Sequence, residues 1–354
     1  MSPNSSPADA FMRVALAAVL GFVVVTGALV LGFRNWLDAP LNLSRPEMIE
    51  LPPGGNLRGL LGDLHARKVL MHPFLLRCYL RIEGKANKVR AGEYLLEPGI
   101  TPRGVIRKLL SGEVVEYAVT VVEGTTLADM LAELHRQPKL RRVIPPSDAA
   151  RVSSLLSETF SGRASPEGLF FPDTYHFHLG MTDQDLLSAS HRRLVEVLEE
   201  EWSGRAEGLP YRDAYEALVM ASLVEKETGR AAERGAIAGV FVRRLQSGML
   251  LQTDPSVIYG LGAAFDGNLT RAHLRTPGPY NTYLSKGLPP TPIALPGRAA
   301  IHAALHPEPG TALYFVARGD GTHQFSDTLE AHNRAVQRFQ RPGRSKRSAG
   351  SADL

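Results

Sequence analysis

The hydrophobic pattern of the chain begins with an unbroken apolar run near the N-terminus. Residues 14–33 carry no charge, and Arg13 and Arg34 bound them. About 20 apolar residues cross a ~30 Å hydrocarbon core as a helix, whereas a signal peptide has a shorter apolar run and a small-residue cleavage site. No A-x-A follows here, and Arg34 and Trp36 suit the interface. The pattern predicts an uncleaved transmembrane anchor over 14–33, with residues 1–13 as a short cytoplasmic tail and the remaining chain on the other side.

Three later stretches each predict a strand, a tight glycine turn and a helix. They begin near residues 49, 93 and 119. Glycine suits such turns because it adopts positive φ without steric cost, and Thr101 before Pro102 and Thr125 or Thr126 are suitable N-caps. The first and third helices have the apolar spacing of one buried face, carried by Leu57, Leu60, Leu61 and Leu64 and by Leu127, Met130, Leu131 and Leu134.

Longer helical patterns follow a loop-rich stretch at 137–165. Residues 183–206 place Leu186, Leu187, His191, Leu194 and Leu198 on one stripe. Further helices are predicted over 218–229, 233–249, 297–306 and 328–340, with a strand at 312–318 and a turn-rich segment after Leu251. The expected fold class is α+β, and 354 residues favour two folded domains over one.

The composition of the chain excludes several classes of function. The chain is 44% hydrophobic and 21% charged, so it can bury cores, and its formal charge of +4 is too small to indicate a nucleic-acid partner. The single cysteine, Cys78, excludes an internal disulfide, and no Cys/His cluster predicts zinc. The simplest expectation for Cys78 is a small buried hydrophobe. The basic tail over 341–354 is expected to be disordered.

Residues 252–297 suit a sugar ligand. Long loops rich in proline and glycine often hold ligand sites, and this one contains hydroxyl, amide and carboxylate groups beside aromatic rings that can pack on a sugar face. Each residue alone is also an ordinary turn residue. The candidates are Gln252, Thr253, Asp254, Tyr259, Tyr280, Asn281, Thr282 and Tyr283.

Glu225 ends an otherwise apolar stripe. Leu218, Ala221, Ser222 and Glu225 lie at i, i+3, i+4 and i+7 of one helix. A carboxyl group beside buried apolar atoms favours its protonated form, as a general acid needs near neutral pH. Glu227 lies about 200° further round the helix, so it is expected on a solvated face. The alternative for Glu225 is a structural hydrogen bond at the helix end.

Several ordered motifs carry a family resemblance. The stretches "SLVEKETG", "LLQTDPSVIYGLG", "PYNTYLSKGLPPTPI" and "EGLFFPDTYHF" closely resemble those of the MltG (YceG-like) endolytic murein transglycosylases, in order over about residues 119–339. Leu169 and Leu295 depart from the pattern. The resemblance implies a LysM-like module over 45–118, a larger mixed α/β catalytic domain over 119–340 with its acid on a helix, and no cofactor.

The resemblance also implies site residues and a mechanism. The catalytic glutamate corresponds to the first Glu of "VEKE", which is Glu225, and the cleft motifs to Gln252, Thr253, Asp254, Tyr280, Asn281, Thr282 and Tyr283. Asp173 and Tyr175 are expected to be structural. One acid then cleaves the β-1,4 bond between N-acetylmuramic acid and N-acetylglucosamine, and the muramyl C6 hydroxyl closes a 1,6-anhydro ring. Implied partners are nascent peptidoglycan strands, the membrane that holds the N-terminal helix, and glycan-polymerising synthases; no nucleic acid is expected.

Three alternatives remain open from the sequence. A hydrolase would use Glu225 with a second carboxylate, for which Asp173 and Asp254 are candidates. A non-catalytic anchor would bind glycan through the LysM-like module. A metal site at His176 and His178 has no apparent third ligand.

Overall fold

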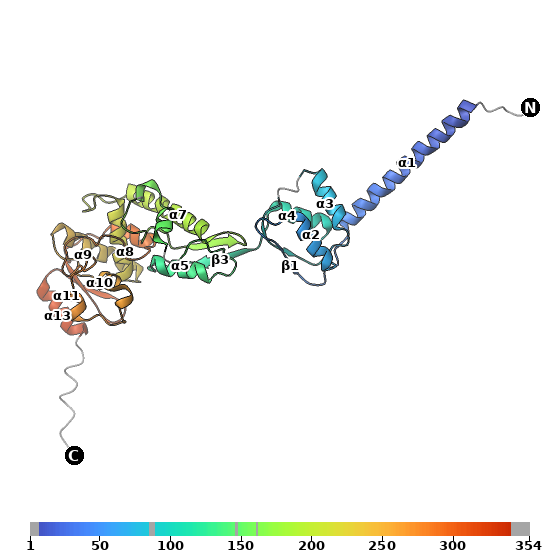
Figure 1. The fold of residues 1–354 in the computed structure, drawn as a ribbon. Helices are drawn as coiled ribbons and strands as arrows, with labels where there is room; N and C mark the ends of the chain where they lie inside the picture. Colours follow the sequence, from blue (N-terminus) through green and yellow to red (C-terminus); the bar gives the residue numbers. More distant parts are fainter. Residues whose placement is uncertain (1–6, 85–88, 146–147, 161, 341–354) are drawn as a thin grey trace, which may run out of the picture. The chain divides into compact units, whose positions relative to one another are not determined.

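The computed structural model describes residues 7–84, 89–145, 148–160 and 162–340, so the predicted tail over 341–354 lies outside the described residues. Contacts divide the chain into two compact units. One comprises residues 1–117 with 178–180, and the other comprises residues 118–177 with 181–354. Both units contain helices and strands (Figure 1), and the predicted α+β fold class is confirmed. The LysM-like character of the first unit stays a prediction.

The predicted anchor is a helix, and it is longer than expected. Helix α1 spans Pro7–Asp38, and within residues 11–38 an apolar window of 18 residues has a mean hydropathy of 2.7, with none of that window buried within the protein. The extra turns at its end have a packing reason, because Leu37 is 2% exposed in the core of the first unit. A charged hydrogen bond of 2.6 Å from Arg103 Nε to Asp38 Oδ1 also ties the helix end to this unit.

The first unit packs three further helices on a two-stranded sheet. Its elements are β1 (Glu47–Leu51), α2 (Leu57–Ala66), α3 (Pro73–Ile82), β2 (Gly92–Leu96) and α4 (Pro102–Ser111). Strands β1 and β2 are antiparallel, with Ile49 opposite Tyr94, and both residues are fully buried. The predicted apolar face of α2 and the Thr101 cap of α4 are confirmed. Helix α3 was not predicted. It leaves Cys78 half-buried, so the expected burial of this thiol is wrong.

The second unit is mostly helical. Strand β3 (Glu116–Thr120), which begins at the boundary between the units, pairs with β4 (Thr174–His178), and β5 (Tyr314–Ala317) pairs with β6 (His323–Ser326). The buried face of α5 and the stripe of α7 are confirmed. The stretch after Leu251 is more helical than expected, since it contains α10 and α11. The helices of this unit are α5 (Leu127–Arg136), α6 (Ala149–Ser153), α7 (Asp183–Ser203), α8 (Ala214–Glu227), α9 (Arg234–Gln246), α10 (Asp254–Leu261), α11 (Arg271–Arg275), α12 (Arg298–Leu305) and α13 (Leu329–Gln340).

Helix α8 lies at the centre of this unit. Helices α7, α9, α10 and α12 (Arg298–Leu305) all contact it, and every residue from Ala217 to Val224 is at most 1% exposed. A helix that is apolar all round is a core helix, so the single buried stripe predicted for it is too narrow. The Ser222 hydroxyl is also buried, and it accepts a 3.0 Å hydrogen bond from the Ile293 N–H.

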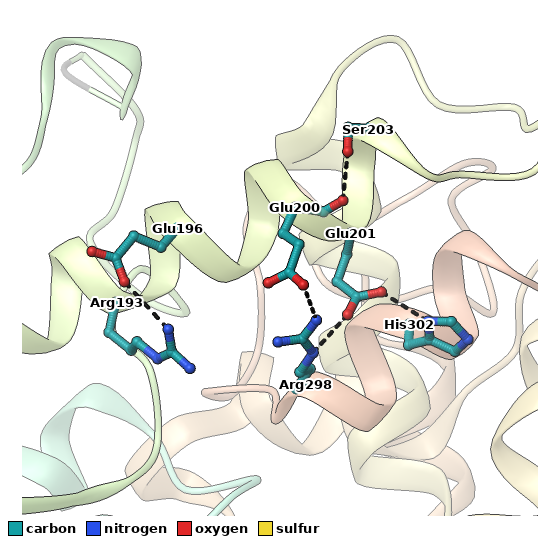
Figure 2. A network of polar contacts seen from close by, with 7 residues as sticks. All are labelled: Arg193, Glu196, Glu200, Glu201, Ser203, Arg298 and His302. Atoms are coloured by element: carbon teal, nitrogen blue, oxygen red, sulfur yellow. Dashed lines mark hydrogen bonds and ion pairs between the residues drawn. The ribbon is translucent and has the colours of Figure 1, made fainter.

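A polar network fastens the end of α7 to α12 (Figure 2). Arg298 lies between two carboxylates of α7 and donates to Glu201 Oε1 and Glu200 Oε1, both at 2.7 Å. The second oxygen of Glu201 contacts His302 Nδ1 at 2.8 Å. Because the Glu201 side chain is only 8% exposed, its bond to arginine is screened less than a surface pair would be. The network therefore helps to hold α12 against α7.

Gly168 provides a test of packing beside this core. It has φ of +77°, and a Cβ atom there would lie 2.3 Å from Pro292 Cβ, in a ring that cannot swing away. We expect Gly168→Ala to lower the free energy of unfolding by about 2 kcal/mol more than Gly208→Ala. Gly208 is a matched control, because it has φ of +72° with open space around it. Chemical unfolding of the full chain in detergent measures both, and equal losses would contradict the packing argument.

Candidate active site

The two glutamates at the end of α8 face different surroundings. The helix begins at the cap residue Asp213, whose side chain accepts from the Glu216 N–H, and it ends where Thr228 becomes extended. Glu225 and Glu227 are two residues apart, which is about 200° round a helix. Their carboxyl groups therefore reach separate sites, and the contacts of each group decide what it can do.

Glu225 has polar partners instead of the apolar surroundings expected from the stripe. Its side chain is 6% exposed. One oxygen accepts a 3.0 Å hydrogen bond from the Gly297 N–H, and the other lies 3.3 Å from an Arg234 guanidinium nitrogen. Glu123 lies near the same arginine, at 4.0 Å. Burial, and then the charge of Glu225, raise the pKa of Glu123. The Glu225 group joins the end of α8 to the start of α9 and to the loop before α12.

Glu227 carries the desolvated carboxyl group, so the solvated face expected for it is wrong. The Thr253 hydroxyl donates a short hydrogen bond to Glu227 Oε1. Burial raises the pKa of Glu227 to about 7, and the nearby Asp254 adds to the rise, while the bond from Thr253 and the charge of His323 oppose it. The Glu227 residue as a whole is partly exposed. A carboxyl group with this pKa is present in both protonation states near neutral pH.

Glu227 opens onto a cleft of about 510 Å³. The cleft joins the end of α8 and the start of α10 to the sheet β5–β6 and to α13. Its lining mixes hydrogen-bonding groups with aromatic rings, which suits a polar ligand with flat faces. The lining residues are Glu227, Arg244, Leu251, Gln252, Asp254, Tyr283, Tyr314, Phe315, Val316, Ala317, His323, Leu329, His332, Asn333, Val336 and Gln340. Glu225 is not among them.

Four of the predicted substrate-binding residues gather around Glu227. Gln252, Asp254 and Tyr283 line the cleft, and Thr253 is buried behind it in contact with Glu227. The Tyr283 hydroxyl donates to Asp254 Oδ1 at 2.5 Å. Gln252 has φ of +53°, a left-handed conformation that is unfavourable for a residue with a Cβ and is often found at functional sites.

The other three predicted residues support this group from behind. Thr282 is 2% exposed, and its hydroxyl accepts from the Thr253 N–H at 3.0 Å. Asn281 is also buried, and its amide donates to backbone carbonyls, with the shortest bond at 2.7 Å to Thr276. The Tyr280 hydroxyl meets that of Thr291 at 2.9 Å, and its ring packs on Tyr259 with centroids 5.0 Å apart.

The motif around Phe170 and Asp173 packs elsewhere in the second unit. The Tyr175 hydroxyl donates to the Phe171 carbonyl at 2.6 Å, and the Asp173 carbonyl accepts from the Val121 N–H at 3.0 Å. Both hydrogen bonds hold the fold together, and the structural role of the Asp173 and Tyr175 side chains stays a prediction. The two departures from the family pattern, Leu169 and Leu295, are fully buried.

Sequence reasoning missed three groups of the cleft. Glu227 is the first, because a stripe argument cannot choose between two glutamates when the helix is buried on every side. Arg244 and His323 are the others, and they lie on α9 and β6. Arg244 donates to the Leu251 carbonyl at 2.9 Å and reaches Gln252 Oε1 at 3.4 Å. His323 Nδ1 contacts Glu233 at 2.8 Å. The sequence signal that did indicate this cleft is the motif "QTDP", which contains Gln252 and Asp254.

A core helix that carries one desolvated carboxyl group into a polar cleft is an arrangement that an enzyme with a general acid can use. The model of the YceG-like family matches residues 49–338, and the chain belongs to this family, as the sequence motifs predicted. An endolytic murein transglycosylase of Bacillus subtilis (strain 168) is 32% identical over 306 residues, which cover 82% of this chain and 84% of the relative.

Two further similarities extend over most of the chain. An endolytic murein transglycosylase of Streptococcus pneumoniae (strain D39) is 26% identical over 367 residues, which cover 90% of this chain and 64% of that longer relative. A crystal structure of a YceG-like protein from Listeria monocytogenes has a TM-score of 0.54 and 28% identity, covering 82% of this chain and 99% of that one.

Proposed function

We propose that this protein is a membrane-anchored endolytic lytic transglycosylase. It cleaves the β-1,4 bond between N-acetylmuramic acid and N-acetylglucosamine in nascent peptidoglycan and leaves 1,6-anhydromuramyl ends. The family membership and the names of the curated relatives support this reaction. The structural observation that carries the proposal is Glu227, a largely desolvated carboxyl group with a pKa raised to about 7 by burial, beside a polar cleft.

We assign the catalytic acid to Glu227 and not to Glu225. Glu227 lines the cleft, whereas both oxygens of Glu225 are occupied by Gly297 and Arg234. A general acid must reach the leaving oxygen of the substrate and hold a proton at the working pH. In this structure the geometry and the desolvation required for that role coincide at Glu227.

The reaction uses the same group twice. Glu227 in its protonated form donates to the glycosidic oxygen while an oxocarbenium-like state develops on the muramyl ring. The resulting carboxylate accepts the proton of the muramyl C6 hydroxyl, whose oxygen bonds to C1 and closes the anhydro ring. Glu227 ends protonated as it began, so neither water nor a cofactor is consumed. Thr253 holds the carboxyl group in place through its hydrogen bond.

Asp254 is the candidate second carboxylate for a hydrolytic reaction at this site. It lines the same cleft as Glu227, and a hydrolase needs a second carboxylate to activate water or attack the sugar. However, the Asp254 carboxylate accepts the short hydrogen bond of Tyr283 and lies in the first turn of α10. These contacts favour a positioning role for Asp254.

The cellular setting follows from the anchor. Helix α1 is long and apolar enough to cross a membrane once. We place the second unit on the extracytoplasmic side, where glycan strands are polymerised, and infer that cleavage there terminates strand elongation. Synthases that polymerise glycan are then the expected partners.

Product analysis of the full-length enzyme tests the reaction. Peptidoglycan digested in water enriched in ¹⁸O should yield 1,6-anhydromuramyl ends without the heavy isotope, because the new bond uses the sugar's own C6 oxygen. A boiled enzyme sample controls for pre-existing anhydro ends. New reducing ends that carry ¹⁸O would show hydrolysis and exclude the proposed reaction.

A further inference from the structure

The outer face of helix α3 is unusually apolar for a surface. Outside α1, eight large hydrophobic residues are strongly exposed among the described residues, and four of them lie on α3 or just before it. Ile82 is 86% exposed, Phe74 and Met71 are 62% exposed, and Leu75 is 38% exposed. The inner face is different, because Leu76 and Leu80 are fully buried in the core of the first unit. Helix α3 therefore has apolar residues on two opposite sides.

Helix α3 lies beside the end of the anchor helix (Figure 1). The Phe33 ring, at the end of the apolar span, lies 6.0 Å from the Tyr79 ring, and Trp36 lies 6.1 Å from His72. Leu37 is buried in the same core. Tryptophan and tyrosine concentrate where a span meets the headgroups. When α1 crosses a bilayer, these contacts hold α3 at the level of the membrane surface.

The order of residues around α3 places its apolar strip next to the anchor. At 100° per residue, the strip of Phe74, Ile82 and Leu75 lies between the side that contacts α1 and the side that carries Arg77 and Arg81. This arrangement of an apolar face with flanking basic residues is typical of helices that lie in the membrane interface.

The basic side of α3 borders a hollow of about 970 Å³. Three arginines line it, namely Arg58, Arg77 and Arg81, and no carboxylate is found among the described residues of its lining. The Arg77 guanidinium packs over the Phe74 ring at 5.6 Å, which keeps the charge next to the apolar strip. Arginines in such a setting match the phosphates of lipid headgroups in both charge and hydrogen-bonding geometry.

We propose that α3 is a second membrane-binding element, which lies in the interface of the bilayer that α1 spans. Phe74, Leu75 and Ile82 enter the boundary between headgroups and acyl chains, and Arg77, Arg81 and Arg58 bind the phosphates of anionic lipids. The anchor and α3 then contact the membrane at two points, so the first unit is held in a fixed orientation on its surface. This inference rests on α1 as the anchor and is independent of the catalytic assignment.

Cys78 provides a native probe, because it is the only cysteine of the chain and lies on this side of α3. The full-length protein is labelled at Cys78 with a small fluorophore and reconstituted into vesicles of phosphatidylethanolamine and phosphatidylglycerol. Quenching is compared between nitroxides attached to lipids near the headgroup and iodide in the water. We expect the lipid nitroxides to quench the probe and iodide to quench it weakly.

Three variants identify the groups responsible. Phe74→Glu with Ile82→Glu should abolish quenching by the lipid nitroxides. Arg77→Gln and Arg81→Gln should each lower the ratio of docked to undocked protein by about fivefold, and replacing phosphatidylglycerol with phosphatidylcholine should act in the same direction. Leu329→Glu is the matched control, since Leu329 is 50% exposed on α13, and it should leave the quenching unchanged.

Two outcomes would overturn the proposal. Strong quenching by iodide, with none by the lipid nitroxides, would show that α3 faces water. Shielding from both quenchers that appears only at a high protein-to-lipid ratio would show that a second copy of the chain covers this face. Because none of the substituted residues is buried, an unchanged melting temperature is expected to accompany each variant and shows that the first unit remains folded.

Discussion

Glu227→Gln is expected to lower the rate of glycan cleavage at least about a thousandfold, because a positioned general acid contributes typically 10²–10⁴-fold. Glutamine keeps the size of the side chain and an oxygen that can accept the Thr253 hydrogen bond, but it has no proton to give. Binding of glycan strands should persist. The measurement is the release of 1,6-anhydromuramyl products by full-length protein in detergent, alongside a binding assay on the same strands.

Glu225→Gln is the matched control for this prediction. It removes the charge that pairs with Arg234 while keeping an acceptor for the Gly297 N–H. We expect it to lower the free energy of unfolding by about 2 kcal/mol, since it leaves a largely buried arginine less well paired, with less than about a tenfold effect on cleavage. The reverse pattern, a folded but inactive Glu225→Gln beside an active Glu227→Gln, would return the acid to the residue that the sequence alone favoured.

If the parent and both variants bind glycan but release no 1,6-anhydromuramyl products, the protein is better described as a glycan-binding anchor. Cleavage by both variants at the rate of the parent would show that neither glutamate is the acid. Loss of cleavage in both, with melting temperatures unchanged, would indicate a pair of acids and so a hydrolytic mechanism. The two substitutions therefore distinguish an enzyme that uses one of these glutamates from a glycan-binding anchor.

The second large effect is a dependence of stability on pH. The pKa of Glu227 is raised from 4.5 to about 7 in the folded protein, mainly by burial. Between these values the folded state keeps a proton that the unfolded state releases, so the free energy of unfolding falls as pH rises. At 1.36 kcal/mol per pH unit, the total contribution is about 3 kcal/mol, fully lost above pH ~7.

The expected result is that Glu227→Gln gains stability over the parent as pH rises from 4 to 8, by about 3 kcal/mol in the difference between the two proteins. Urea unfolding at several pH values measures this difference, and effects of other groups cancel in it. Substitution of the exposed Glu207 by glutamine controls for the loss of one carboxylate elsewhere. A difference that stays constant with pH would show that Glu227 is solvated in the folded protein.

Local sequence signals predicted many of the elements correctly. The charge-free run over 14–33 predicts α1, because crossing a bilayer requires length and apolarity that few other structures need. The spacing of Leu127, Met130, Leu131 and Leu134 predicts the buried face of α5, and Thr101 before Pro102 predicts the cap that begins α4. Each of these signals depends on neighbours within about ten residues, so no knowledge of the tertiary fold is needed to read them.

The sequence by itself determined the family, the anchor and the small set of polar residues from which the site is built. Only the tertiary structure decided what surrounds Glu225 and Glu227. Helix α8 is buried on every side, so its hydrophobic pattern does not identify one inward-facing side. The environment of each carboxyl group is set by partners elsewhere in the chain. Arg234 and Gly297 neutralise one glutamate, while Thr253, Asp254 and the walls of the cleft desolvate the other. Proton affinity depends on those surroundings, and surroundings are a property of the folded protein.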